Sequence, residues 1–167
     1  MNILINFKEI KKNITKKDNF YFITLIIIIF LFDRISKLKI INEFNENILF
    51  VNDFINFDLI WNTGIGFGLL SNNSPFFYNL ITFLIAIIIL FMFYILLKSN
   101  IADKVIFSFI IGGALGNFYD RISYKAVPDF IDLHYNNYHW FTFNFADIFI
   151  TLGVTGYLVK DFFKQKI

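Results

Sequence analysis

The stretch FFYNLITFLIAIIILFMFYILL, residues 76–97, contains 22 residues and no charge. A helix of this length rises about 1.5 Å per residue and spans about 33 Å, enough to cross the hydrocarbon core of a bilayer. The rest of the chain is similar, because 57% of its 167 residues are hydrophobic and 21% are aromatic, with a mean hydropathy of +0.61. A soluble core of this size cannot bury so much apolar surface, so the sequence predicts one integral membrane domain.

We predict an all-α membrane protein with four spanning helices, at about residues 20–40, 76–97, 103–121 and 140–160. The third apolar run ends at Asp120 and Arg121, and the only charge between Trp140 and Val159 is Asp147. The first run is not expected to be a cleaved signal peptide, because its polar head is too long and no small-residue cleavage site follows it.

The distribution of lysines predicts how these helices are oriented. Ten of the fifteen cationic residues lie in the N-terminal tail, the link between the second and third spans, and the C-terminal tail: Lys8, Lys11, Lys12, Lys16, Lys17, Lys98, Lys104, Lys160, Lys164 and Lys166. By the positive-inside rule, both termini are predicted to be cytoplasmic and the loops at about 41–75 and 122–139 to face outward. The net charge of +2 gives no indication of a nucleic-acid partner, and the lack of cysteine excludes thiol catalysis and thiolate metal sites.

Two carboxylates, Asp129 and Asp147, lie within the segment VPDFIDLHYNNYHWFTFNFAD, residues 127–147. An ionisable group near membrane depth is costly and by default indicates a functional site. Because the third and fourth spans should be antiparallel neighbours, we expect the two carboxylates to meet and to titrate as a unit with one shared proton. The ionised member can take a proton from water while the other donates to a scissile carbonyl, which predicts aspartyl proteolysis. The alternative is that Asp147 only caps or salt-bridges a helix end.

Charged and amide side chains elsewhere are predicted to lie at the same depth. Asp33 and Lys37 are four residues apart, so they share a helix face and can form an ion pair, although for Lys37 taken alone extension to the interface is the favoured interpretation. Asn117 and Arg121 lie one turn apart and could donate to peptide carbonyls, or could serve packing and interfacial anchoring.

Glycines mark two further segments. WNTGIGFGLL, residues 61–70, contains Asn62 and three glycines that permit close backbone approach, but no Lys-Ser/Thr follows, so it is not a phosphate loop. Gly112 and Gly116 are four residues apart and predict a seam where two helices pack tightly.

Three other functions fit parts of this pattern. A proton or cation transporter could use Asp33, Asp129 and Asp147, but it would spread charges through the membrane, whereas these cluster toward the outer side. A metal-assisted hydrolase could use His134, His139 and Asp132, but their spacing matches no standard zinc motif, and solvated loop histidines are the favoured interpretation. A non-catalytic scaffold would tolerate loss of either Asp129 or Asp147.

Together these stretches resemble the bacterial lipoprotein signal peptidases, also called type II signal peptidases. The resemblance runs from about residue 20 to residue 160 and rests on five motifs in order: D-x-x-x-K, N-x-G-x-x-F-G, G-x-x-G-N-x-x-D-R, V-x-D-F-I and F-N-x-A-D. It implies that Asp129 and Asp147 are the catalytic pair. It also implies that ten residues shape the site or hold substrate: Asp33, Lys37, Asn62, Gly64, Gly112, Gly116, Asn117, Arg121, Asn144 and Ala146.

The resemblance further implies what the protein acts on. Members of this family cut prolipoproteins just before a cysteine that carries diacylglycerol, at the outer surface of the cytoplasmic membrane. They use no metal or cofactor and are inhibited by globomycin. The expected partners are therefore diacylglyceryl-modified prolipoproteins and membrane lipids, and we expect a monomer. A small β-rich cradle should follow the first span, and a short loop or helix between the third and fourth spans should close over the substrate.

The sequence departs from the family pattern at three places. Alanine is usual at Gly66 or its neighbour Ile65, proline is usual where Phe141 stands, and an apolar residue is commoner at Pro128. None of these changes removes a charged or amide group of the expected site. They bear on turnover or substrate range more than on activity itself.

Overall fold

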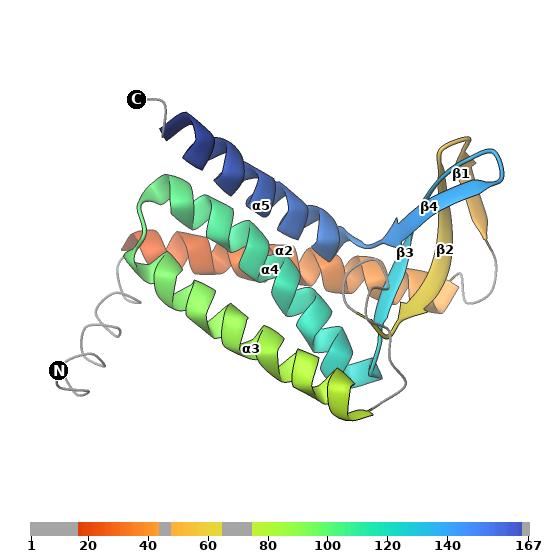
Figure 1. Cartoon of the computed structure of the whole chain (residues 1–167), viewed down its shortest axis with the longest axis horizontal. Coiled ribbons are helices and arrows are strands. Elements are labelled where there is room, and N and C mark those ends of the chain that lie inside the picture. The colour runs from red at the N-terminus through yellow and green to blue at the C-terminus, as the bar shows by residue number, and fades with distance from the viewer. Residues whose placement is uncertain (1–16, 44–47, 65–74, 165–167) are drawn as a thin grey trace.

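The computed structural model describes residues 17–43, 48–64 and 75–164. In this part of the chain, four helices run alongside one another and a small sheet lies at one end of them (Figure 1). The helices are α2 (Lys17–Glu43), α3 (Pro75–Lys98), α4 (Ile101–Tyr124) and α5 (Phe145–Lys164). Helix α4 packs against each of the other three and is therefore the centre of the bundle.

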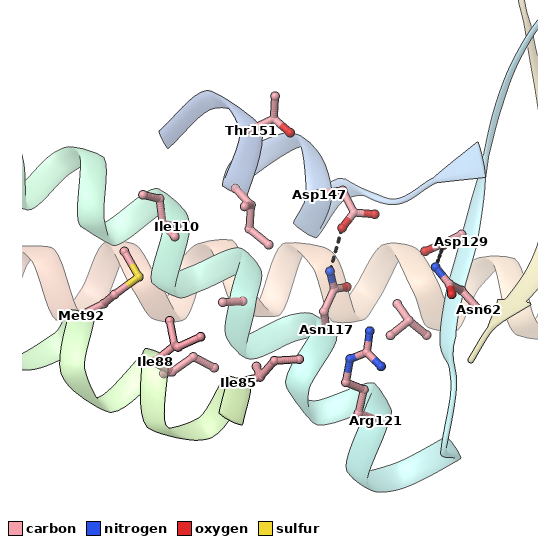
Figure 2. Close-up of a pocket in the computed structure, with 14 residues that line it drawn as sticks. Asn62, Ile85, Ile88, Met92, Ile110, Asn117, Arg121, Asp129, Asp147 and Thr151 are labelled. Carbon is pink, nitrogen blue, oxygen red and sulfur yellow. Dashed lines mark hydrogen bonds between the residues drawn. The ribbon is translucent and has the colours of Figure 1, made fainter. Parts of the chain in front are cut away.

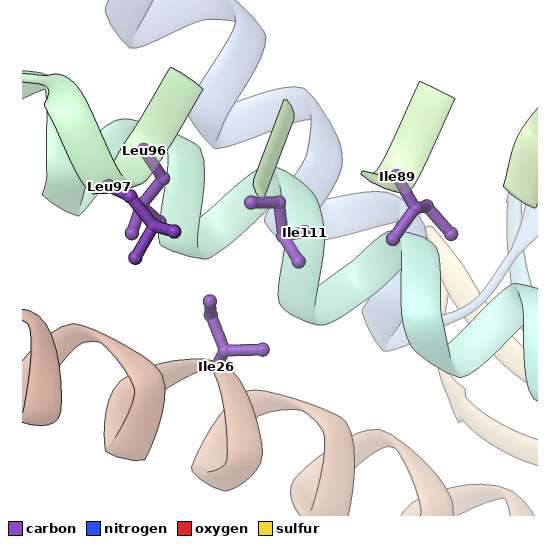
Figure 3. Packing of buried hydrophobic residues seen from close by; sticks show 5 residues of the cluster. All are labelled: Ile26, Ile89, Leu96, Leu97 and Ile111. Atoms are coloured by element: carbon purple, nitrogen blue, oxygen red, sulfur yellow. The ribbon is translucent and has the colours of Figure 1, made fainter. Parts of the chain in front are cut away.

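Two of the four helices described, α3 and α4, are long and apolar enough to cross a membrane. Only 17% of the residues in the most apolar stretch of α3 are buried inside the protein. A surface this apolar is stable in lipid rather than in water, in agreement with the prediction made from residues 76–97. Helices α2, α3 and α4 meet in a cluster of Ile26, Ile89, Leu96, Leu97 and Ile111 (Figure 3).

Glycines on α4 allow its neighbours to approach closely, as the sequence predicts. A Cβ atom on Gly112 would lie 2.7 Å from Cγ2 of Ile29 on α2, and one on Gly116 would collide with Oδ2 of Asp33. On the side facing α5, a Cβ atom on Gly113 would collide with the carbonyl oxygen of Ala146. These contacts set the distances at which α2 and α5 hold their polar residues against α4.

The sheet has four antiparallel strands in the order β1-β2-β3-β4. Strands β1 (Leu49–Asn52) and β2 (Ile55–Asn62) form the β-rich segment expected after the first helix. Strand β2 pairs with β3 (Val127–Tyr135), so that Asn62 lies opposite Val127 and Ile60 opposite Asp129. Residues Val127 to Asp132 are all buried, with Phe130 and Ile131 packed near Ile40 of α2.

The segment between α4 and α5 differs from the expectation. The sequence predicts a short loop or helix at about 122–139 and a spanning helix from about residue 140. Instead, α4 continues to Tyr124, β3 and β4 (Tyr138–Phe143) form a hairpin, and α5 begins only at Phe145. Hydropathy alone cannot separate an apolar strand from the start of an apolar helix, and the sequence YHWFTF is rich in aromatic residues that favour strands.

Candidate active site

Asp129 and Asp147 line one cavity of about 360 Å³, together with the polar side chains of Asn62, Asn117 and Arg121 (Figure 2). Nearly all of the remaining lining is apolar and comes mainly from α3, α4 and α5: Ile85, Ile88, Ile89, Met92, Ile110, Ala114, Val127, Ile150 and Thr151. The cavity therefore has a polar end at the two carboxylates and an apolar wall along the helices. Residues far apart in the sequence meet here, as the sequence predicts for the two carboxylates.

Asn144 joins the two carboxylates. Its side-chain Nδ2 donates to Oδ1 of Asp129 at 2.5 Å, while its backbone N–H donates to Oδ2 of Asp147 at 3.2 Å. In return, the backbone N–H of Asp147 donates to Oδ1 of Asn144 at 3.1 Å. These reciprocal bonds at the start of α5 have the pattern of a capping box, which fixes both side chains. Asp147 does cap its helix, and the same contacts aim it into the cavity.

A second set of contacts holds Asp129 from the other side. Nδ2 of Asn62 donates to Oδ2 of Asp129 at 2.9 Å (Figure 2). Oδ1 of Asn62 accepts from the backbone N–H of Gly64 at 2.8 Å, and the carbonyl oxygen of Gly64 accepts from Nη2 of Arg121 at 2.6 Å. Arg121 thus holds Gly64 in the turn that follows β2. Because the N–H of Gly64 donates to Oδ1 of Asn62, the Nδ2 end of that amide faces Asp129.

Asp147 is held in the same manner by a different amide. Nδ2 of Asn117 donates to Oδ1 of Asp147 at 2.8 Å (Figure 2), and Oδ1 of Asn117 accepts from Nζ of Lys37 at 2.8 Å. Because an ammonium group can only donate, Lys37 determines which end of the Asn117 amide faces Asp147. Both carboxylates therefore receive hydrogen bonds from side-chain amides. The orientation of each amide is set by the donor to its oxygen, which is the N–H of Gly64 for Asn62 and Lys37 for Asn117.

Lys37 lies at the centre of a buried ionic cluster. It is 0% exposed, and Nζ lies 2.9 Å from Oδ2 of Asp33 and 2.8 Å from Oδ2 of Asp120. The predicted pair of Asp33 and Lys37 is therefore confirmed, and the alternative of a lysine extending to the interface is wrong. Oδ1 of Asp33 also accepts from the backbone N–H of Ala146 at 3.0 Å, which ties α2 to the start of α5.

The environment of Asp129 favours its protonated form. Burial raises the pKa of Asp129 to about 7, and the neighbouring Asp147 carboxylate contributes to this rise, against the opposing hydrogen bonds from Asn62 and Asn144. Asp129 is therefore protonated below about pH 7 and only partly so at neutral pH, while both carboxylates stay within reach of donors that orient them. Such an arrangement can perform general acid–base chemistry.

The structure accounts for most of the residues that the sequence suggests. All twelve candidate positions lie in the described part of the chain, whereas Gly66 and Ile65 lie outside it. Pro128 is buried in β3 opposite Trp61, and Phe141 belongs to β4. Arg34 and Asp120 are not among the twelve candidate residues, although both are buried and connect to Lys37. The signal that could have indicated Asp120 is its place in the motif G-x-x-G-N-x-x-D-R.

The histidines form a separate cluster on the sheet. His134 belongs to β3 and is 5% exposed, so it is not a solvated loop residue; its ring stacks on His139 of β4 and lies against Asn56 of β2. Nδ1 of the exposed His139 lies 2.7 Å from Oδ2 of Asp132. Within residues 17–43, 48–64 and 75–164, no group of three histidine, cysteine or acidic side chains is arranged to hold a metal ion.

In three dimensions the chain is similar to two bacterial membrane enzymes that were solved by the in meso method. The structure at 2.3 Å resolution matches with a TM-score of 0.71 and 30% identity, covering 87% of this chain and 89% of that one. The structure at 1.9 Å resolution matches with a TM-score of 0.67 and 31% identity, covering 84% and 91%. The fold, four helices with a small antiparallel sheet, is thus that of a class of bacterial membrane enzymes.

Sequence comparison identifies the family within that class. The model of the family described as signal peptidase (SPase) II matches residues 25–163. A lipoprotein signal peptidase of Pelagibacter ubique (strain HTCC1062) is 48% identical over 153 residues, which cover 89% of this chain and 92% of the relative. One from Blochmanniella pennsylvanica (strain BPEN) is 36% identical over 174 residues, covering 100% and 99%. This chain belongs to the signal peptidase II family, which confirms the resemblance seen in the five motifs and makes it a peptidase.

Proposed function

We propose that this protein is an aspartic endopeptidase that removes the signal peptide from prolipoproteins, cutting just before a cysteine that carries diacylglycerol. Its relatives are named lipoprotein signal peptidase. The observation that carries the aspartic mechanism is the pair of buried carboxylates, Asp129 and Asp147, which share one cavity and one bridging residue, Asn144.

The reaction needs one proton on the pair. In the first step Asp147 takes a proton from water, the water oxygen attacks the scissile carbonyl carbon, and Asp129 gives its proton to the carbonyl oxygen. In the second step the C–N bond of the tetrahedral intermediate breaks. Asp147 returns its proton to the leaving nitrogen of the cysteine, and Asp129 recovers a proton as the carbonyl re-forms. Both carboxylates end as they began, and neither forms a covalent bond to substrate.

Arg121 is suited to hold the peptide during these steps. It lines the cavity, is 5% exposed, and donates a hydrogen bond from Nη2 to the carbonyl oxygen of Gly64. Its Nε and Nη1 atoms have no hydrogen-bond partner among the residues that the structure describes. A buried guanidinium with spare donors beside the carboxylate pair can bind carbonyl oxygens of an extended substrate.

The apolar part of the cavity suits the lipid-modified end or the signal peptide of such a substrate. Ile85, Ile88 and Met92 of α3 line it together with Ile110 of α4 (Figure 2), and Ile150 of α5 belongs to the same wall. Apolar chains can rest against this wall without leaving a lipid-like environment, while the scissile bond reaches the polar end.

We further propose that all four helices cross the bacterial inner membrane and that the sheet and the carboxylate pair lie near its outer face. The start of α2, the turn between α3 and α4, and the end of α5 lie at the end of the bundle away from the sheet (Figure 1). Those ends carry the lysines, which supports cytoplasmic termini. The protein is proposed to act as a monomer, without a metal or other cofactor, and to bind globomycin-type inhibitors.

The proposal is tested by cleavage of a diacylglyceryl-modified prolipoprotein with the purified protein in detergent, in the presence of EDTA. We expect the parental protein to cleave, and Asp129→Asn and Asp147→Asn each to lose cleavage while still inserting and folding. Asp53→Asn, at an exposed carboxylate in the β1–β2 turn, is the matched control and should cleave at the parental rate. Cleavage at the parental rate by either folded site variant would refute the assignment, and loss of cleavage in EDTA would refute a metal-free reaction.

A further inference from the structure

Arg34 is buried behind the site but does not line the cavity. It lies on α2, where its Nη1 atom is 2.6 Å from Oδ1 of Asp120 on α4. Its guanidinium carbon also lies 4.9 Å from the centre of the Tyr119 ring, a distance typical of cation–π contact. Arg34 thus pairs with one specific carboxylate and is shielded on another side by an aromatic ring.

Asp120 connects Arg34 to the carboxylate pair. While Oδ1 of Asp120 faces Arg34, Oδ2 lies 2.8 Å from Nζ of Lys37. Nζ of Lys37 donates to Asn117 at 2.8 Å, and Asn117 donates to Asp147 at 2.8 Å. Four consecutive contacts therefore run from α2 through α4 to the start of α5. Each of them joins a buried or half-buried group to the next.

The charges of this cluster balance. Asp33 and Asp120 contribute two negative charges, and Arg34 and Lys37 contribute two positive ones, with the side chains of all four at most 8% exposed. Removal of Arg34 leaves two carboxylates for a single ammonium group in a site with little water. The uncompensated negative charge then acts on Asp147 and Asp129, and Lys37 has to satisfy Asp120 alone.

We propose that Arg34 is a positioning residue for proteolysis. By neutralising Asp120 it leaves Lys37 able to hold the amide of Asn117, and therefore Asp147, in a single orientation. Arg34 touches neither substrate nor the reacting atoms. This inference rests on the proposed catalytic role of Asp147.

The test is the pH profile of prolipoprotein cleavage by Arg34→Gln, Asp120→Asn and the double variant. Arg34→Gln adds one net negative charge behind the site, so its profile should move to higher pH. Asp120→Asn adds one net positive charge and should move it to lower pH. In the double variant the cluster is neutral again and the amide oxygen introduced at position 120 can still accept from Lys37, so the two shifts should cancel.

The rates provide a second readout. Misplacement of a reacting group costs about tenfold to 100-fold in rate, so we expect kcat of Arg34→Gln to fall in this range while KM changes less. Arg34→Lys keeps the charge and should restore the parental profile. Lys39→Gln, which removes an exposed cation from the same helix, is the matched control and should leave both profile and kcat unchanged.

A structural role alone would lower the melting temperature of the variants without opposite shifts in pH profile. That result, or shifts in the same direction, would overturn the inference. If Arg34→Gln does not fold, the opposite shift of Asp120→Asn and its reversal in the double variant decide the question. Failure of the proposed function is recognised separately, because either the parental protein would not cleave prolipoprotein or Asp147→Asn would retain cleavage, whatever the Arg34 variants do.

Discussion

Asn144 has two separable roles in one side chain. Its Oδ1 atom caps α5 by accepting from the N–H of Asp147, and its Nδ2 atom donates to Asp129. Aspartate is as good a helix cap as asparagine but cannot donate to a carboxylate when it is ionised. A single substitution can therefore remove the bridge and keep the cap.

We expect Asn144→Asp to lose cleavage by about 100-fold or more and to lower the melting temperature, since it places a third, fully buried carboxylate against the pair although the cap is kept. Thermal unfolding and cleavage, both in detergent, measure the two effects. Asn100→Asp makes the same change at the cap of α4, far from the cavity, and should remain active. Equal loss in both variants would show that the cap and not the bridge matters.

The raised pKa of Asp129 leads us to predict how activity depends on pH. With that pKa at about 7, the pair loses its last proton as the pH rises through neutrality. We therefore expect kcat/KM, measured from pH 5 to pH 9, to fall above about pH 7. The fall should approach about tenfold per pH unit, as for the loss of a single proton. A profile that stays flat from pH 7 to pH 9 would contradict a mechanism that needs a protonated Asp129.

Titration of Asp129 also leads us to predict how the stability of the protein depends on pH. Folded Asp129 keeps its proton up to about pH 7, whereas the unfolded chain releases it near pH 4. Between these values the folded state binds more protons, so this group makes the free energy of unfolding decrease as the pH rises, by at most about 4 kcal/mol. Asp129→Asn cannot titrate, and its melting temperature relative to the parental protein should increase from pH 5 to pH 8. A constant difference across this range would argue against a buried, protonated Asp129.

At the scale of helices, the spacing of α4 from α2 depends on Gly116. A methyl group there would collide with the carboxylate of Asp33, which also binds Lys37 and the N–H of Ala146. We expect Gly116→Ala to destabilise the protein by a few kcal/mol, to abolish cleavage, and to do so even though alanine favours helices.

Gly156→Ala is the matched control for that prediction. A Cβ atom on Gly156 would meet Ile106 at 3.7 Å, which is an ordinary van der Waals contact. The melting temperature should therefore stay constant or rise slightly, with activity unchanged. An unchanged melting temperature in Gly116→Ala would mean that the collision is relieved by movement of α2, and a similar loss in Gly156→Ala would mean that the loss does not come from the collision.

Some parts of the fold and of the candidate site could be predicted from the sequence, and others could not. The helices follow from uncharged runs, and the meeting of Asp129 with Asp147 follows from two antiparallel neighbours near one membrane face. The β3–β4 hairpin could not be predicted in this way, because its aromatic strand is as hydrophobic as the helix that follows. The Arg34–Asp120 pair could not be predicted either. An ion pair between α2 and α4 depends on which faces the two helices turn toward each other, and local sequence patterns do not determine this.

At the scale of the whole molecule, the chain has no cysteine, so single cysteines can report its orientation. We expect Asn137→Cys, in the exposed β3–β4 turn, to react with a membrane-impermeant maleimide in intact cells. Ala102→Cys, exposed near the start of α4, should react only after the cells are opened. The opposite pattern would invert the proposed topology, and labelling of both from outside would refute a cytoplasmic α3–α4 turn.

The contact between Asp33 and Ala146 spans 113 positions of the sequence, and it joins the first helix described to the start of the last. The ribosome synthesises Asp33 and Lys37 early, so Asp33 lacks its partner at Ala146 until the last helix has been made. Asp129 likewise lacks Asn144 until that moment. We therefore expect a chain that ends before α5 to have no peptidase activity. On the proposed mechanism, the active site is complete only after α5 has been synthesised.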